Sequence, residues 1–168
     1  TDKAQVAIDA FEKWCDNNGI HYADSGYETL KKTDGFIDAI KHLNDENSNR
    51  VRYWPDKICV KTSSQYVEIK YGKTIQREAY HNYIDLHNIG YDIGIVYYCD
   101  GKLLFSKINE LVLKRAKFYG VPIELNTWIC PRKMPPAEYA KWKKKHPYAS
   151  GTDYAYIDFA MSKTFELQ

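Results

Sequence analysis

The 168-residue chain lacks the short cysteine spacings of zinc knuckles and redox dithiols, because its four cysteines lie roughly 30 to 45 positions apart. It has no apolar run long enough to cross a bilayer as a helix, and no secretory leader is expected at its start. A glycine-rich phosphate loop, a Gly-x-Ser-x-Gly elbow and a His-x-Glu with paired cysteines are also missing. We therefore expect free, mostly buried cysteines and a reducing, intracellular setting, either cytoplasmic or, for a eukaryotic virus, nuclear.

The composition is that of an ordinary globular domain, with 44% hydrophobic and 27% charged residues, which excludes a mostly disordered chain. The net charge of +2 is unevenly placed. Residues 1–49 carry 5 Lys/Arg against 10 Asp/Glu, whereas residues 50–168 carry 19 against 12. The later excess of positive charge favours a polyanionic partner. The 15 tyrosines and the many Lys and Asn residues are typical of an AT-rich genome, such as that of a phage.

Hydrophobic periodicity predicts alternating helices and strands in one domain. Helices are expected over residues 3–18, 35–43, 74–89 and 108–119, with Thr74 as the N-cap of the third and Gly90 just beyond its end. Strands are expected over 50–54, 57–61, 66–70, 92–99, 102–106, 126–130 and 153–159, with a polar break at 44–49 and a hairpin turn at 100–101. This order predicts a mixed α/β domain, with a central mixed sheet of about five strands flanked by helices. We expect a core over about residues 3–120 and a basic C-terminal extension over about 121–168.

The strongest local pattern pairs Pro55-Asp56 with Glu68-Ile69-Lys70. Side chains alternate along a strand, so Glu68 and Lys70 lie on one face. Such charges on an otherwise buried strand are costly unless a charged partner is present. A Mg²⁺ ion held by Asp56 and Glu68 would be that partner, and Lys70 could orient or deprotonate one of its waters. The alternative is a Pro-Asp turn beside a solvated strand edge, because Glu-x-Lys also occurs by chance.

The register of the hairpin decides whether the two carboxylates can meet. A four-residue turn at 62–65 places Glu68 opposite Cys59 and sends Asp56 to the other face of the sheet. A five-residue loop at 61–65 places Asp56 opposite Lys70 instead. The metal site requires the second register or a bulge.

Gln76 and Tyr80 form a second pattern, four residues apart at the start of the helix that follows. They lie on one helical face, where a Gln near the positive end of the helix can contact a phosphate or a metal-bound water. Taken alone, the pair is equally well explained as surface residues.

Together, in this order, the two patterns resemble the PD-(D/E)XK nuclease superfamily, and Gln-x-x-x-Tyr resembles the extra motif of its RecB/Cas4/lambda-exonuclease-like branch. The resemblance covers about residues 50–106 and implies a restriction-endonuclease-like core. It implies Asp56 and Glu68 as metal ligands, Lys70 as the catalytic lysine, and Gln76 and Tyr80 as a supporting pair. It also implies the Ile69 carbonyl as a ligand, and Glu12 as an acid contributed by the first helix.

The resemblance implies a Mg²⁺-dependent deoxyribonuclease, with Mn²⁺ as a substitute and DNA as the partner. We expect an endonuclease of phage or mobile-element origin. The alternatives are a Holliday-junction resolvase, an exonuclease, a viral-type RNA endonuclease, or an inactive nucleic-acid-binding module. The sequence is also compatible with a homodimer and indicates no membrane partner.

Basic residues that we expect to contact the nucleic acid lie near the motif and in the C-terminal part. They are Lys73, Arg77, Arg132, Lys133, Lys141, Lys143, Lys144 and Lys145. The aromatic residues interleaved with the later ones suggest an arm that follows phosphates and stacks bases. A solvated helix face with its aromatic residues turned inward explains the same pattern.

Overall fold

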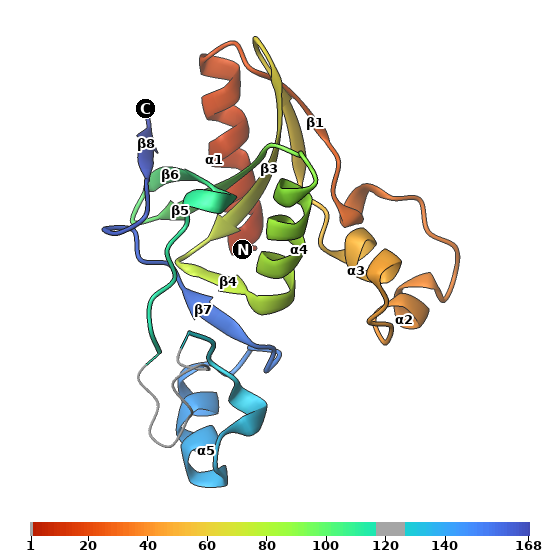
Figure 1. The fold of residues 1–168 in the computed structure, drawn as a ribbon, viewed down its shortest axis with the longest axis vertical. Coiled ribbons are helices and arrows are strands. Elements are labelled where there is room, and N and C mark those ends of the chain that lie inside the picture. Colours follow the sequence, from red (N-terminus) through yellow and green to blue (C-terminus); the bar gives the residue numbers. More distant parts are fainter. Residues whose placement is uncertain (1, 117–126) are drawn as a thin grey trace.

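The computed structural model describes residues 2–116 and 127–168, and its centre is a six-stranded mixed sheet (Figure 1). In spatial order the strands are β1 (His21–Asp24), β2 (Lys57–Val60), β3 (Ser64–Tyr71), β5 (Ile93–Cys99), β6 (Lys102–Lys107) and β8 (Phe165–Leu167). Strands β3 and β5 pair in parallel, and the other neighbours in this sheet pair antiparallel. The predicted mixed α/β class is confirmed, with one strand more than expected.

Helix α1 (Lys3–Asn17) covers one face of the sheet, as predicted. Its buried residues recur every four positions, at Ala7, Phe11 and Cys15. They pack with Val67 and Ile69 of β3 in one hydrophobic cluster. Because side chains alternate along a strand, Glu68 and Lys70 face away from α1.

Helix α4 (Arg77–Asn88) lies on the opposite face and connects β3 to β5 as a βαβ crossover. Its buried residues Tyr83 and Leu86 pack with Ile95 and Tyr97 of β5. The helix begins later than predicted, because β4 (Thr74–Gln76) pairs instead with β7 (Tyr154–Tyr156) in a second, two-stranded sheet. Gln76 is therefore the N-cap residue, and the prediction for Thr74 was wrong.

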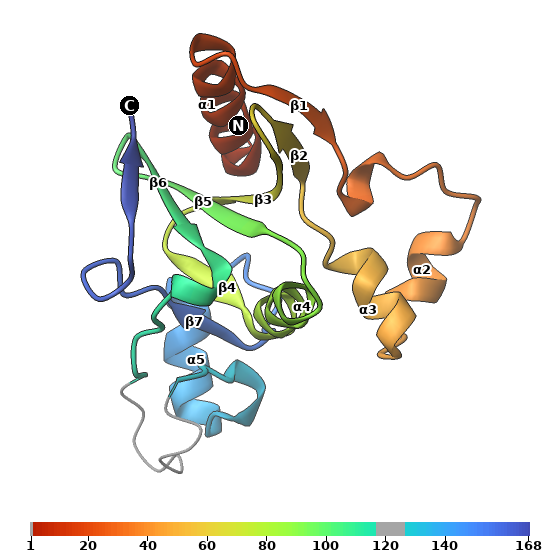
Figure 2. The same cartoon turned by 45° about the horizontal axis from the view of Figure 1, so that its top comes forward.

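An insertion between β1 and β2 projects beside the sheet and carries η1 (Tyr27–Thr29), α2 (Phe36–Ile40) and α3 (Glu46–Arg52) (Figure 2). The predicted strand at 50–54 was wrong, and the polar break predicted at 44–49 is limited to residues 44 and 45, because α3 begins at Glu46. Asp45 caps α3 by accepting a hydrogen bond from the Ser48 amide at 3.0 Å. Arg50 then donates a 2.8 Å hydrogen bond to Asn82 Oδ1 of α4, which ties the insertion to the core.

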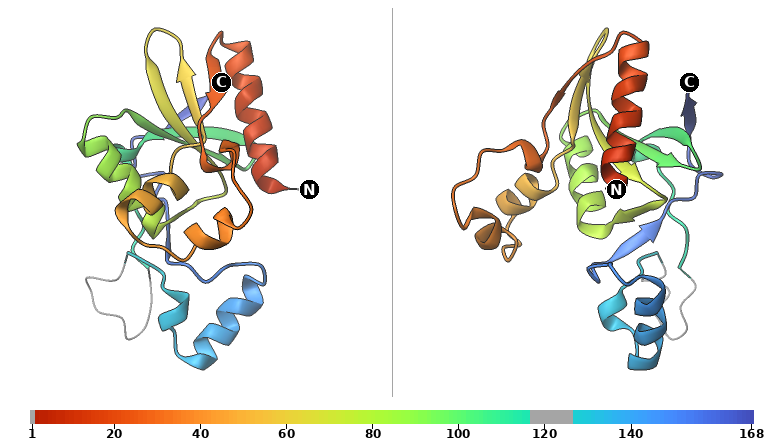
Figure 3. Two further views of the ribbon diagram at one scale, coloured as in Figure 1. Left: turned by 90° about the vertical axis from the view of Figure 1, so that its right-hand side faces the viewer. Right: turned by 180° about the vertical axis from the view of Figure 1, so that it is seen from behind.

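The C-terminal part gathers at one end of the molecule, and its last segment returns to the sheet (Figure 3). It contains η4 (Pro131–Lys133), α5 (Pro136–Lys145), β7 and β8. The predicted extension thus supplies β8 as an edge strand of the core. None of the described helices is both long and apolar enough to cross a membrane.

Two predicted elements around the undescribed residues 117–126 were wrong in their described portions. Instead of a helix from 108, the chain forms the short η2 (Ile108–Glu110), and Leu113 then makes a β-bridge to Ile157. The strand expected at 126–130 is reduced to a bridge from Ile129 to Tyr154. Residues 117–119 and 126 of these two predictions lie outside the described part.

Candidate active site

Asp56 and Glu68 meet at the open end of the β2–β3 hairpin. The strands pair as Lys57 with Val67 and Val60 with Ser64, which leaves a three-residue loop at 61–63. One step beyond Lys57, Asp56 comes opposite Glu68, and opposed residues share a face. Both registers considered from the sequence were therefore wrong, because the loop is shorter than either. The convergence of the two carboxylates is nevertheless what the metal hypothesis required.

Backbone amides of β3 and of the loop after β1 hold Asp56 in place. Asp56 Oδ2 accepts a 2.9 Å hydrogen bond from the Ile69 amide, so the side chain reaches across to β3. The Asp56 carbonyl accepts hydrogen bonds from the Ser25 amide at 2.9 Å and the Gly26 amide at 3.2 Å. A Cβ atom on Gly26 would lie 3.1 Å from the Cα of Asp56, so the close approach of this loop favours glycine.

Glu68 is buried, with only 6% of its surface exposed. Burial raises the pKa of Glu68 well above its ordinary value. The nearby Lys70 ammonium lowers this pKa in part, whereas the hydrogen bond and negative charge of Asp56 raise it further. Without a cation, the pair therefore favours a proton on Glu68; a bound cation would favour its loss.

Lys70 shares its face with Tyr97 of β5, because the two residues are register partners in the parallel pair β3–β5. Tyr97 is 1% exposed, and its hydroxyl has no hydrogen-bond partner among the described residues. Burial raises the pKa of Tyr97, and so does the negative charge of Glu68, which places the phenol in the electrostatic reach of the carboxylate pair. The carboxylate pair therefore has a buried neighbour, Tyr97, on the same face as Lys70, and the hydroxyl of this tyrosine can still form a hydrogen bond.

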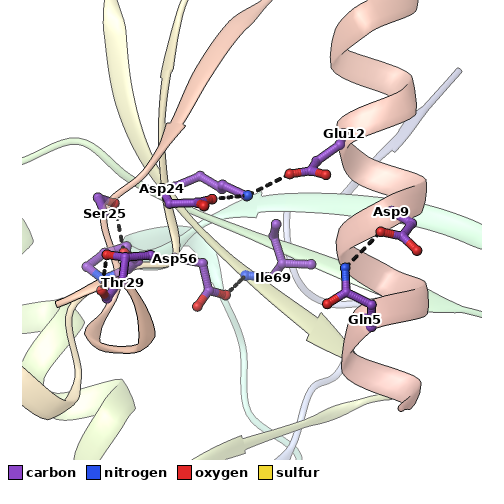
Figure 4. A network of polar contacts seen from close by, with 11 residues as sticks. Gln5, Asp9, Glu12, Asp24, Ser25, Thr29, Asp56 and Ile69 are labelled. Carbon is purple, nitrogen blue, oxygen red and sulfur yellow. Dashed lines mark hydrogen bonds and ion pairs between the residues drawn. The ribbon is translucent and has the colours of Figure 1, made fainter. Parts of the chain in front are cut away.

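Glu12, the acid expected from the first helix, lies on the other face of the sheet. Lys57 is buried there, and its ammonium forms ion pairs with Glu12 at 2.7 Å and with Asp24. Figure 4 shows the carboxylates of Glu12 and Asp24 on this side, while Asp56 is directed to the backbone of Ile69. The structure thus gives Glu12 a structural partner and does not bring it to the Asp56–Glu68 pair.

The carboxylate pair offers oxygen ligands of the kind that a hard divalent cation prefers. Within residues 2–116 and 127–168, no group of three or more His, Cys, Asp or Glu residues is arranged to hold a metal ion. Two adjacent carboxylates still suit Mg²⁺, which keeps several waters and takes one or two carboxylates from the protein. A cation would offset the repulsion within the pair, and the unpaired Tyr97 hydroxyl could hydrogen-bond to the pair or to a metal-bound water. The residues present therefore fit a hydrated cation; the role of the Ile69 carbonyl stays a prediction.

Gln76 and Tyr80 are not held against the carboxylates by any hydrogen bond among the described residues. Gln76 is exposed, makes no side-chain capping bond and lines a cavity beside α5. Tyr80 is half-buried beside Trp128, with ring centroids 5.6 Å apart, and this burial raises the pKa of Tyr80. The expected supporting pair is thus split between two environments.

Three of the predicted nucleic-acid-binding residues form ion pairs or hydrogen bonds within the protein. Lys73 pairs with Asp100 at 3.5 Å, and Arg77 pairs with Asp153 at 3.3 Å. Lys143 donates a 2.8 Å hydrogen bond to the Ala149 carbonyl. The other members are exposed, namely Arg132, Lys133, Lys141, Lys144 and Lys145.

The chain matches no family model and shows no significant similarity to a curated protein. Any functional inference therefore depends on the geometry described above. Three residues with a role here were not predicted from the sequence: Tyr97 and Gly26, which lie beside the pair, and Lys57, which lies on the opposite face with Glu12. A tyrosine inside the apolar run 93–99 was a weak sequence signal for Tyr97, but Gly26 and Lys57 acquire their roles only through contacts between segments far apart in the sequence.

Proposed function

We propose that this protein is a metal-dependent nuclease that hydrolyses phosphodiester bonds, with DNA as its substrate. The observation that carries the proposal is the pairing of the buried Glu68 with the half-buried Asp56, with Lys70 on the same face of β3. The order of elements around the pair supports it, because α1, the β2–β3 hairpin, α4 and β5 follow one another as the PD-(D/E)XK resemblance implies.

Each residue of the candidate site would have its own role in the hydrolysis. Asp56 and Glu68 would hold the ion, and the Ile69 amide keeps Asp56 oriented. Bound Mg²⁺ would supply Lewis acidity and a water of lowered pKa. Lys70 would orient the attacking water or stabilise charge developing on the phosphate, because it shares the face of β3 that carries Glu68.

The direct test is incubation of the protein with plasmid, linear duplex, branched DNA and RNA, each with Mg²⁺, Mn²⁺ or EDTA. We expect metal-dependent cleavage of DNA that EDTA abolishes. Cleavage of closed plasmid identifies an endonuclease, loss of linear duplex alone an exonuclease, and preference for branched DNA a resolvase. If every substrate survives with both metals, the chain is a binding module and the proposal is overturned.

Two variants separate the roles within the site. We expect Glu68→Ala to lose both metal affinity and cleavage, because this carboxylate holds the ion. Lys70→Ala should keep metal affinity and lose most cleavage, because its ammonium acts on the reacting groups. Lys102→Ala, an exposed lysine on β6, is the matched control. Calorimetric Mn²⁺ titration measures affinity; equal loss of metal in both site variants would contradict this division.

A further inference from the structure

A cavity of about 280 Å³ lies between α5 and the small β4–β7 sheet. Its floor is one face of that sheet, because Thr74 pairs with Tyr156 and Gln76 pairs with Tyr154. Trp142 of α5 and His146, the residue that follows this helix, form one wall, and residues 149–152 form the rim. The cavity thus combines aromatic side chains with the side-chain amide of Gln76 and the hydroxyl of Thr74.

Hydrogen bonds hold the walls of this cavity in place. Trp142 is buried, and its Nε1 donates a 2.8 Å hydrogen bond to the Tyr154 hydroxyl. Lys143 donates to the Ala149 carbonyl at 2.8 Å, which ties the rim to the end of α5. Because these contacts exist in the protein alone, a ligand need not order the site, and the entropic cost of binding is reduced.

The chemistry of the lining selects a planar, heteroaromatic ligand. Aromatic side chains provide stacking surfaces, and stacking of a base on such a ring contributes about 1–3 kcal/mol. Gln76 has an amide that both donates and accepts, and this amide is not used to cap α4. An amide of this kind matches the paired donor and acceptor atoms on the edge of a nucleobase.

The charge around the cavity favours an anionic ligand. Helix α5 carries four lysines and a single glutamate in its ten residues, and Lys144 and Lys145 are exposed. Gln76 is also close to the candidate active site along the chain, since β4, which carries it, follows directly after β3, which carries Lys70. A nucleic-acid strand bound along this path would bring phosphates to the lysines and a base to the cavity.

We propose that this cavity binds one unpaired nucleobase of the substrate strand. This inference rests on the proposed function, because it assumes a nucleic-acid substrate. A base inside a duplex cannot enter such a cavity without leaving its stack, so the bound region is single-stranded or locally opened. Tyr156, which is 37% exposed, offers the accessible stacking ring, and Gln76 contacts the edge of the base.

The test measures binding in EDTA, where cleavage is blocked, by fluorescence anisotropy of labelled single strands. We expect Tyr156→Ala to weaken binding roughly 5- to 100-fold, the equivalent of one lost stacking contact. Gln76→Ala should weaken it less, and a 2-aminopurine base in the strand should be quenched by wild type but not by Tyr156→Ala. Tyr148→Ala is the control, because Tyr148 is fully exposed and lies outside the cavity lining.

The possible outcomes separate this inference from the nuclease proposal. If Tyr156→Ala and Gln76→Ala fold, bind and quench as wild type does, the cavity does not hold a base, although metal-dependent cleavage would still stand. If free adenosine monophosphate competes as strongly as the strand does, the cavity is a mononucleotide site and the inference is overturned. If wild type neither binds nor cleaves any nucleic acid, both proposals fail. Thermal unfolding of each variant checks that the fold is intact.

Discussion

The fold disfavours the ionised form of the Glu68 carboxyl group. It is buried, it stands next to Asp56, and both factors raise its pKa. A group whose pKa is higher in the folded than in the unfolded state retains its proton longer when folded. The metal-free protein therefore loses stability as pH rises from about 4.3, the ordinary value for Glu, through the raised pKa of Glu68.

Glu68→Gln should remove this loss, because its neutral amide has no charge to bury and can donate to Asp56. We expect the free energy of unfolding of the metal-free variant to exceed that of wild type by about 1–3 kcal/mol at pH 8 and to converge with it near pH 4. Urea denaturation in EDTA across this range checks the prediction. A wild-type stability that rises with pH relative to the variant would contradict it. Added Mg²⁺ should stabilise wild type only.

Tyr97 offers a second test, because its hydroxyl has no hydrogen-bond partner within the described part of the chain, and an unpaired buried hydroxyl costs free energy. We expect Tyr97→Phe to raise the free energy of unfolding in EDTA by about 1 kcal/mol. The same variant should gain less stability from saturating Mn²⁺ than wild type, because the hydroxyl acquires a partner once the ion and its waters are bound. Denaturation with and without Mn²⁺ measures both effects.

Tyr154→Phe is the matched control for this prediction, because it removes a hydroxyl that already accepts a hydrogen bond from Trp142. It should lower stability by about 1 kcal/mol and leave the metal effect unchanged. An equal Mn²⁺ response in Tyr97→Phe and wild type would show that this hydroxyl does not take part in the site.

At the scale of elements, α1 is joined to the strands by a network of ion pairs that includes Glu12, the residue that the resemblance assigned to the metal site. Lys57 is buried beneath the helix and paired with Glu12 and Asp24. Burial lowers the pKa of Lys57, but the hydrogen bonds and charges of these two carboxylates outweigh it, and the net pKa is raised. Lys57 therefore stays charged, and it needs its partners.

Glu12→Ala should consequently destabilise the fold without affecting the metal. We expect a loss of about 1–3 kcal/mol in the free energy of unfolding, less than for a buried pair without a second partner, because Asp24 remains. Mn²⁺ affinity should equal that of wild type. Calorimetric titration below the unfolding temperature measures it, with Glu68→Ala as the comparison. A tenfold loss of affinity in Glu12→Ala would restore Glu12 as a ligand.

The elements that could be predicted were those with long, clean patterns. Helix α1, the hairpin β5–β6 and the strand carrying Glu68 and Lys70 were confirmed, because their apolar periods extend over several turns or pairs. The alternation at 50–54 was misleading, since five residues fit a strand as well as the short helix α3 that Asp45 caps. Strand β4 took the first turn of a predicted helix because its partner, β7, lies about 80 residues later, beyond the reach of local patterns.

The candidate site shows the same limit. Glu68 and Lys70 share a face by strand alternation alone, which the sequence supplies. Their alignment with Asp56 depends on a three-residue loop, and a change of one residue in that loop would move the carboxylate to the other face. Tyr97 joins the site only through the parallel pairing of β3 with β5.

At the scale of the whole molecule, two regions with different chemistry follow one another along the chain. The carboxylate pair lies in the central sheet, and the lysines of α5 lie at the end of the molecule where the C-terminal part gathers (Figure 3). Strand β4 links them, because it follows β3 and pairs with β7. A substrate that spans both regions would be positioned through its phosphates by the lysines of α5 and cleaved at the carboxylate pair.

The exposed lysines of α5 are expected to contact the phosphates of the substrate. Lys143 is excluded from the test, because its hydrogen bond to Ala149 supports the cavity rim. The triple change of Lys141, Lys144 and Lys145 to Ala removes exposed charges only. If each contacts one phosphate, the slope of log affinity against log salt should fall by roughly 2 to 3 on duplex DNA, since each contact contributes about 0.9.

Affinity should fall alike for all sequences, and the rate of cleavage at saturating substrate should stay unchanged, because these side chains carry no metal-binding oxygen. The matched control replaces Lys13, Lys31 and Lys102, three exposed lysines outside α5, and so changes the net charge equally. If both triple variants flatten the slope to the same extent, the effect is one of total charge and α5 is a solvated helix face. A loss confined to the α5 variant places the substrate backbone along this helix, on the side of the molecule that holds the proposed base cavity.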